Sequence, residues 1–562
     1  MFEFDFIVHK RYSNIIMKKK ETIFIISCLL LTVIIVGGII GRHVMRDNTQ
    51  SYSGLAVNSN YRFPARQFGG FLAAQHAIYV NDFPGAERFS ASLKDIQYPI
   101  VKNTKMISEF LSGFLPYDAK LLKSEKTMPA TLIYDAYLVK NNNWKEFHNR
   151  HKTDTVALLA PLRIWSAIAN NWRTNTFKYI DTLPTNESWK SFIRGQIYAE
   201  LGNLDSAVMH FEKVAPEFMN INDYMYLMSF YTHHDMNDRA DKLRQDFTSR
   251  PGGMFLANYN DFPDWSVYSG YANALAFSMI QNVSHTHALM YSDMAMVLLR
   301  FSQIIAPKFA STNNVIDYYI GQFYFKNVGN WSGSFANINE KSPFYLFAKM
   351  RIAEKTGDIS HLEYILERAP LFVPAVNKLT GHYIRNGNYR SALRVIDNTL
   401  SADGVSEFAR AFFTKGRAYI HYSFGDYAAA QKDIDYAKQY LKGDAELMSI
   451  QAKVWAAQNI ELDSAYNYAM ILVRNNPSDI LAWDALGRVV AVREGNNAAL
   501  EMLVRVGDVS ETCSSLYENM GDLYIATGDI EKAKQSYSRA IELSDDGLVV
   551  VPNIEKKLRK IK

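Results

Sequence analysis

The sequence predicts an all-α protein, built as a solenoid of antiparallel helix pairs. Two observations predict this class: a unit of about 34 residues recurs along the chain, and apolar residues within each unit follow helical spacing. The clearest unit lies at residues 517–546, where Tyr517, Met520 and Tyr524 have the i, i+3, i+7 spacing of one helix face. One helix pair cannot bury its own apolar face, so it needs neighbours.

The turn within this unit is predicted at Gly528 and Asp529. Gly528 can adopt the positive φ that the residue after a helix often requires, and Asp529 suits the N-cap of the helix that follows. Gly521 on the first helix and Ala533 on the second are small, so the two helices can approach closely. We therefore expect a helix–turn–helix unit with tight internal packing.

Copies of the unit recur upstream at nearly constant spacing. The small residue of the second helix falls at positions separated by 38, 35, 34 and 34 residues: Ala392, Ala430, Ala465, Ala499 and Ala533. An ordinary helical bundle would not hold this register over four steps. A good match in the N-terminal half consists of Gly195, Tyr198, Gly202, Ala207 and Phe211.

This pattern resembles the tetratricopeptide repeat, whose signature has Trp, Leu, Gly and Tyr on helix A and Ala and Phe on helix B. The resemblance implies a right-handed superhelical solenoid whose A helices line a concave, partner-binding face. By position in the repeat, the candidate partner-binding groove comprises Phe413, Arg417, His421, Asp484, Arg488, Glu518 and Asp522, with Phe192, Gln196 and Glu200 as counterparts in the N-terminal half.

One specialised form of the family recognises a C-terminal carboxylate through Lys and Asn on successive A helices. This chain has the acidic residues Glu518 and Asp522 there, so the resemblance does not extend to that form. The mixed charges suit an extended or helical protein segment with basic and apolar side chains. The alternative is that these residues are simply the solvated positions of A helices.

Seven segments are predicted along the chain. Pro251-Gly252-Gly253 and Asn258–Asp261 are rich in turn-forming residues and interrupt the repeat pattern, although repeats could continue undetected through this part. The segments are a cytoplasmic stretch (1–21), a transmembrane signal-anchor helix (22–41), a linker (42–65), a degenerate repeat array (66–250), an irregular helical joint (251–345), the C-terminal repeat array (346–546) and a basic capping helix (547–562).

The transmembrane prediction rests on twenty residues without a charge, from Thr22 to Gly41. A helix of that length spans a bilayer, and the basic residues before it favour a cytoplasmic N-terminus. Residues 42–562 would then face the periplasm of a bacterial inner membrane. The alternatives are a cleaved signal peptide, a lipoprotein signal at Cys28, and a true start at Met17.

Composition and motifs give no support for other classes of function. The formal net charge is +4, without a basic stripe or a nucleic-acid-binding motif. The two cysteines, Cys28 and Cys513, provide neither a disulfide within the soluble part nor a zinc cluster. His233-His234-Asp235 is the nearest approach to a metal site, but adjacent histidines on a helix point apart, so a turn between helices is expected there.

No arrangement of nucleophile, base and orienting residue is recognisable in the sequence. We therefore expect no enzymatic activity, no cofactor, no metal and no small-molecule substrate. The sequence predicts a membrane-anchored scaffold or adaptor for protein–protein interactions on the periplasmic side of a bacterial envelope. The alternatives are an accessory subunit of an envelope polysaccharide-synthesis or secretion complex, and an enzyme with a site in residues 251–345.

Overall fold

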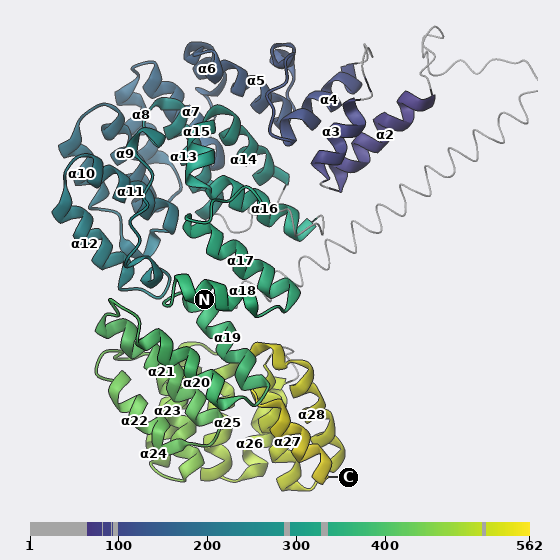
Figure 1. The fold of residues 1–562 in the computed structure, drawn as a ribbon, viewed down its shortest axis with the longest axis vertical. Coiled ribbons are helices and arrows are strands. Elements are labelled where there is room, and N and C mark those ends of the chain that lie inside the picture. The colour runs from purple at the N-terminus through teal and green to yellow at the C-terminus, as the bar shows by residue number, and fades with distance from the viewer. Residues whose placement is uncertain are drawn as a thin grey trace, which may run out of the picture. The chain divides into compact units, whose positions relative to one another are not determined.

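A computed structural model describes residues 65–80, 82–91, 93, 99–154, 156–285, 293–327, 335–507 and 513–561. Throughout these ranges the regular structure is helical, without a strand, and successive helices pair as antiparallel neighbours (Figure 1). The predicted fold class, an all-α solenoid of helix pairs, is confirmed. No helix in the described ranges combines the length and apolar character needed to cross a membrane, and the predicted span at 22–41 lies outside them.

The helices of the N-terminal half are α2 (Ala65–Tyr79), α3 (Phe83–Ala91), α4 (Pro99–Leu111), η1 (Ala119–Ser124), α5 (Met128–Lys140), α6 (Trp144–His151), η2 (Ala157–Leu159), α7 (Ala160–Ala169), α8 (Arg173–Thr182), α9 (Glu187–Glu200), α10 (Leu204–Phe211), η3 (Pro216–Phe218), α11 (Ile221–His233) and α12 (Asn237–Thr248). They are followed by η4 (Met254–Leu256), η5 (Trp265–Val267), α13 (Tyr271–His285), α14 (Asp293–Ile305), α15 (Pro307–Asn313) and α16 (Val315–Asn327).

The C-terminal half contains α17 (Pro343–Thr356), α18 (Ser360–Arg368), α19 (Val373–Arg385), α20 (Tyr389–Leu400), α21 (Glu407–Ser423), α22 (Tyr427–Ala437), α23 (Ala445–Gln458), α24 (Leu462–Asn475), α25 (Ile480–Arg493), α26 (Asn496–Gly507), α27 (Ser514–Thr527), α28 (Ile530–Glu542), η6 (Ser544–Asp546) and α29 (Val551–Lys560). From α17 to α28 the odd-numbered helices are A helices and the even-numbered ones are B helices.

The turn between α27 and α28 has the predicted chemistry. Gly528 caps α27 with a φ of +88°, and the side chain of Asp529 accepts a hydrogen bond from the backbone N–H of Lys532 at the start of α28. Likewise α11 ends at His233, and Asp235 has a φ of +56°. The His233-His234-Asp235 motif is therefore a turn between helices, as expected.

Close packing within the helix pairs explains the small residues of the repeat. A Cβ atom added to Gly521 would lie 2.5 Å from Cδ1 of Tyr537, and one added to Gly487 would lie 2.5 Å from a methyl carbon of Leu503. In each pair, a glycine of helix A contacts a large side chain sixteen residues later on helix B. The alanines that define the register are all fully buried: Ala392, Ala430, Ala465, Ala499 and Ala533.

The hydrophobic cores show how residues 251–345 pack. The core of the N-terminal half includes Phe277 of α13, Phe301 of α14 and Phe309 of α15. The predicted joint thus contributes regular helices to that core. Separate hydrophobic clusters follow in the C-terminal half, one around α19–α21 and another around α25–α28. Ile554 of α29 is fully buried in the latter cluster, which places α29 against the last repeat.

Candidate functional site

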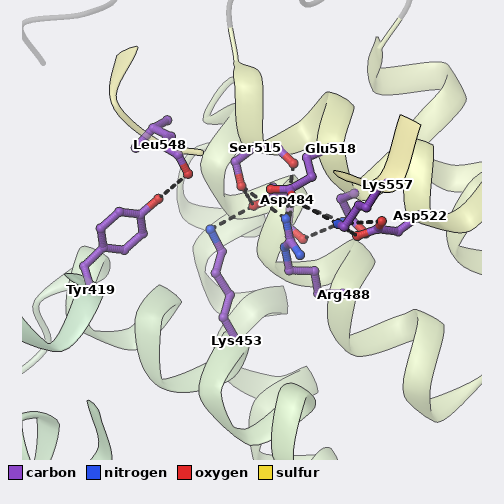
Figure 2. Close-up of polar contacts among 10 residues, drawn as sticks. Tyr419, Lys453, Asp484, Arg488, Ser515, Glu518, Asp522, Leu548 and Lys557 are labelled. Atoms are coloured by element: carbon purple, nitrogen blue, oxygen red, sulfur yellow. Dashed lines mark hydrogen bonds and ion pairs between the residues drawn. The ribbon is translucent and has the colours of Figure 1, made fainter. Parts of the chain in front are cut away.

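The A helices of the last repeats lie side by side, with α23 contacting α25 and α25 contacting α27. A ladder of charged residues runs across them and continues onto α29 (Figure 2). Its members, which we call the A-helix ladder, are Lys453, Asp484, Arg488, Glu518, Asp522 and Lys557. Three positive and three negative side chains make it electrically balanced, so it offers no strong field to a highly charged ligand.

Asp484 is the centre of the ladder, and its carboxylate is fully buried. One oxygen accepts from Lys453 Nζ at 2.8 Å and Ser515 Oγ at 2.7 Å, while the other accepts from Arg488 Nε and Asn519 Nδ2, each at 3.1 Å. These donors come from α23, α25 and α27, so one carboxylate joins three consecutive repeats. A buried charge is tolerated only when it is paired and hydrogen-bonded in this way.

The pKa shifts agree with this pairing. Burial alone would raise the pKa of Asp484, but Arg488 and Lys453 hold it well below its ordinary value. Burial would also lower the pKa of Lys453, yet Asp484 raises it above its usual range. Both groups are therefore charged at neutral pH. This part of the ladder is a buried ion network that links three repeats.

The second part of the ladder joins the last repeat to α29. Lys557 Nζ lies 2.9 Å from Glu518 Oε1 and 2.7 Å from Asp522 Oδ1. Tyr537 donates its hydroxyl to Asp522 Oδ1 at 2.6 Å. The acidic pair that distinguishes this chain from the carboxylate-binding form is thus occupied by the chain's own lysine.

The structure brings only four of the predicted groove residues together, namely Asp484, Arg488, Glu518 and Asp522. Phe413 is buried in a hydrophobic cluster of α19–α21. Arg417 is held by Asp433 and Asp397, at 2.8 and 3.0 Å. His421 Nδ1 shares a 2.7 Å hydrogen bond with the hydroxyl of Tyr389, and burial lowers its pKa.

The counterparts in the N-terminal half are also engaged within the chain. Phe192 and Gln196 are buried, and Gln196 accepts a hydrogen bond from Ser278 Oγ at 3.1 Å. Glu200 accepts from the backbone N–H of Gly270 at 2.8 Å, and burial raises the pKa of Glu200 to about 7. As binding residues for a partner, all these positions remain predictions.

Sequence reasoning missed Lys453 and Lys557 of the ladder, and also Tyr419 of α21, whose hydroxyl donates to the backbone carbonyl of Leu548 at 2.9 Å. A signal existed for Lys453, because it stands 34 residues before Gly487, at the position where the two following repeats have a glycine against helix B. A lysine in that place requires a buried counter-charge. Lys557 and Tyr419 gave no such signal, because their partners depend on how the C-terminal segment runs.

Other candidate sites are weaker. Within the ranges that the structure describes, no group of His, Cys, Asp and Glu side chains has the arrangement of a metal site. An open cavity of about 530 Å³ in the N-terminal half is lined by residues that include Lys140, Gln303 and Asp317. Burial raises the pKa of Asp317 to about 6, and the hydroxyl of Ser311, which also lines the cavity, donates to the backbone carbonyl of Lys308 at 3.3 Å.

Comparisons with known proteins bear on the repeat. The profile described as tetratricopeptide repeat matches residues 192–215 and 514–546. None of the curated proteins compared matches the chain significantly. Similar solved structures include a tetratricopeptide repeat protein from Parabacteroides merdae ATCC 43184, which is 15% identical and has a TM-score of 0.29; the match covers 52% of this chain and 99% of that one.

Two further structures cover more of this chain. The Cut9–Hcn1 hetero-tetramer of the APC/C is 14% identical with a TM-score of 0.32, over 88% of this chain and 96% of the other. Yeast Tom70 is 11% identical with a TM-score of 0.28, over 88% and 95%. Similarities this weak support no inference about partners. The two profile matches and the register of the helix pairs together show that the chain contains tetratricopeptide repeats.

Proposed function

We propose that this protein is a membrane-anchored scaffold that binds other proteins on the periplasmic side of a bacterial envelope. The observation that supports this most directly is the row of adjacent A helices, α21 to α27, in a chain of tetratricopeptide repeats. Stacked helix pairs present an extended face that suits binding of protein segments. The uncharged run at residues 22–41, preceded by Lys18, Lys19 and Lys20, supports the anchor and its orientation.

The exposed part of this face is the part that a partner can contact. Val492 lies on α25 eight residues after Asp484, near the end of the same A helix, and its side chain is 44% exposed. Ile471 lies on the B helix α24 and is also 44% exposed. The two positions therefore differ in the helix that carries them and not in their accessibility.

Photo-crosslinking in cells tests the proposal with this matched pair. A photoreactive side chain at Val492 is expected to trap a defined protein, and the same group at Ile471 is expected not to trap it. A trapped subunit of a polysaccharide synthase or secretion complex would specify the scaffold as an accessory subunit. Equal crosslinking from both positions, or from neither, would contradict binding through the A helices.

A further inference from the structure

The C-terminal segment runs from the last repeat back to the first repeats of the same half. We call residues 544–552, which link α28 to α29 and include the first two residues of α29, the C-terminal clasp. Arg385 of α19 donates to Ser544 Oγ at 2.9 Å and pairs with Asp545 at 2.7 Å. Tyr419 of α21 donates its hydroxyl to the backbone carbonyl of Leu548 at 2.9 Å (Figure 2). The clasp thus touches A helices that lie more than a hundred residues earlier in the chain.

Two adjacent valines of the clasp belong to different hydrophobic clusters. Val549 is buried in the cluster of α25–α28, and Val550 is buried in the cluster of α19–α21. Val550 has an extended backbone, and successive side chains of an extended chain point to opposite sides. Through these two side chains, the clasp joins the hydrophobic cluster around α19–α21 to the cluster around α25–α28.

The clasp also contacts α19 directly through its backbone. Gly547 has a φ of +73°, and a Cβ atom added to it would lie 2.5 Å from the Cα atom of Gly381. Since Gly381 also lacks a side chain, the two backbones can meet at a distance that any larger residue on the clasp would prevent. This contact requires a glycine at one defined place in the bound segment.

These contacts resemble those of a bound peptide: a carbonyl held by a side-chain donor, an aliphatic side chain in an apolar site, an acidic residue beside an arginine, and a glycine at a close approach. We propose that the clasp occupies a binding site for segments of other proteins, as a ligand supplied by the chain itself. This proposal rests on the proposed function. The face formed by α19 and α21 accepts from a partner a short segment that carries an acidic residue, a glycine and an aliphatic residue at the positions of Asp545, Gly547 and Val550. It does so only after the clasp has left.

The clasp is covalently linked to the face that it covers, and this link determines how easily a partner segment can replace it. A segment linked to its own site has an effective concentration on the order of millimolar, so a free peptide at micromolar concentration cannot displace it. Weakening the clasp without altering the receptor face should therefore reveal binding that the intact protein does not show. Gly547 offers that change, because it belongs to the clasp, whereas Gly381, Arg385 and Tyr419 belong to the face.

The probe is a fluorescent synthetic peptide with the sequence of residues 544–553, titrated with full-length protein and followed by anisotropy. The Gly547→Ala variant is expected to bind it at least tenfold more tightly than the unmodified protein does. Gly443→Ala is the matched control, because Gly443 has the same φ of +73° but nothing within 4 Å of an added Cβ atom. It should bind as weakly as the unmodified protein. Adding Tyr419→Phe to Gly547→Ala should weaken binding roughly two- to tenfold, through loss of one hydrogen bond.

A peptide with alanine in place of its glycine should bind at least tenfold more weakly than the parent peptide. If Gly547→Ala unfolds the array, Val550→Ser weakens the clasp from its other end and should give the same gain. Equal binding by the clasp and control variants, or by both peptides, would overturn the proposal. No membrane, cell or natural partner enters this assay, so its failure would leave the crosslinking test of the proposed function intact.

Discussion

Replacing Asp484 with asparagine should destabilise the last three repeats by about 3 kcal/mol. The change keeps the size of the side chain but removes its charge. Lys453 then stays with a side chain only 4% exposed and without a counter-ion. Breaking a buried ion pair from one side costs about 3–5 kcal/mol, and the low end applies because the amide can still accept one hydrogen bond. The side chain of Arg488 is 21% exposed and can turn toward water, so its loss of a counter-ion adds little to the cost in stability.

Hydrogen exchange measures this loss where it occurs. A chain of many repeats need not unfold in one step, so a global free energy of unfolding is not well defined. Protection of amides in α23, α25 and α27 should fall about a hundredfold, the equivalent of about 3 kcal/mol, while that of α9 stays unchanged. Asp463→Asn is the control, because Asp463 pairs with Arg493 at 3.1 Å but is 88% exposed. Such a pair is worth at most about 1 kcal/mol.

Equal losses of protection in the two variants, or a cost of less than about 1 kcal/mol for Asp484→Asn, would contradict a buried ion pair between Asp484 and Lys453. Combining Lys453→Met with Asp484→Asn completes a thermodynamic cycle. The double variant should be less damaged than the sum of the single variants, because no buried charge is left alone. Strict additivity would mean that Lys453 and Asp484 do not act as a pair.

Three further outcomes are expected. Gly521→Ala should lower the protection of α27 and α28 by about 1–3 kcal/mol, because Tyr537 must move. Gly416→Ala, where an added Cβ atom has its nearest neighbour 3.8 Å away, should raise the protection of α21 by up to about 1 kcal/mol. A gain in both variants would contradict close packing at Gly521. Because burial raises the pKa of Glu200 to about 7, the folded state holds this proton more tightly than the unfolded state, whose glutamate has a pKa near 4.5. Protection of α9 should thus fall as pH rises from 4.5 to 7, and Glu200→Gln should remove this fall; an unchanged slope in the variant would exclude Glu200 as its source. Burial raises the pKa of the Cys513 thiol to about 12, so alkylation mapped by mass spectrometry at pH 8 should modify Cys513 only after denaturation, and rapid labelling of the native protein would contradict its burial.

Local sequence patterns predicted the helix pairs well, because the features that specify them are local. Helical periodicity, the glycine and aspartate of the turn at 528–529, and the recurring alanines all act within one unit of the repeat. The contact between Gly521 and Tyr537 likewise spans only sixteen residues. These features follow from the chain's own spacing and need no knowledge of distant segments.

The face on which a residue of an A helix lies was harder to predict around α21, where the spacing of the repeat departs from 34 residues. Lys415 of α21 reaches Asp444 at the start of α23, as Lys453 of α23 reaches Asp484 of α25. Asp444 lies just before α23, whereas Asp484 lies within α25, so the two lysines reach carboxylates at different positions of the repeat. Arg417 pairs with Asp433 of α22 and does not join the ladder.

The C-terminal clasp could not be predicted, because its contacts are non-local. Gly547 meets Gly381 from the far end of five repeats, so the contact depends on how far the array turns. Small changes in the angle between successive repeats add up over that length. A basic helix at the end was expected as a cap, and its burial of Ile554 fits that role, but nothing in its sequence indicated that the residues before it bind α19 and α21.

The function proposed for this protein is the binding of other proteins through its A helices. Crosslinking in cells from Val492 and Ile471, two equally exposed positions on an A and a B helix, tests this most directly. One defined protein partner should be trapped from Val492 and not from Ile471. Identical patterns at the two positions, or no trapped protein at Val492, would contradict it.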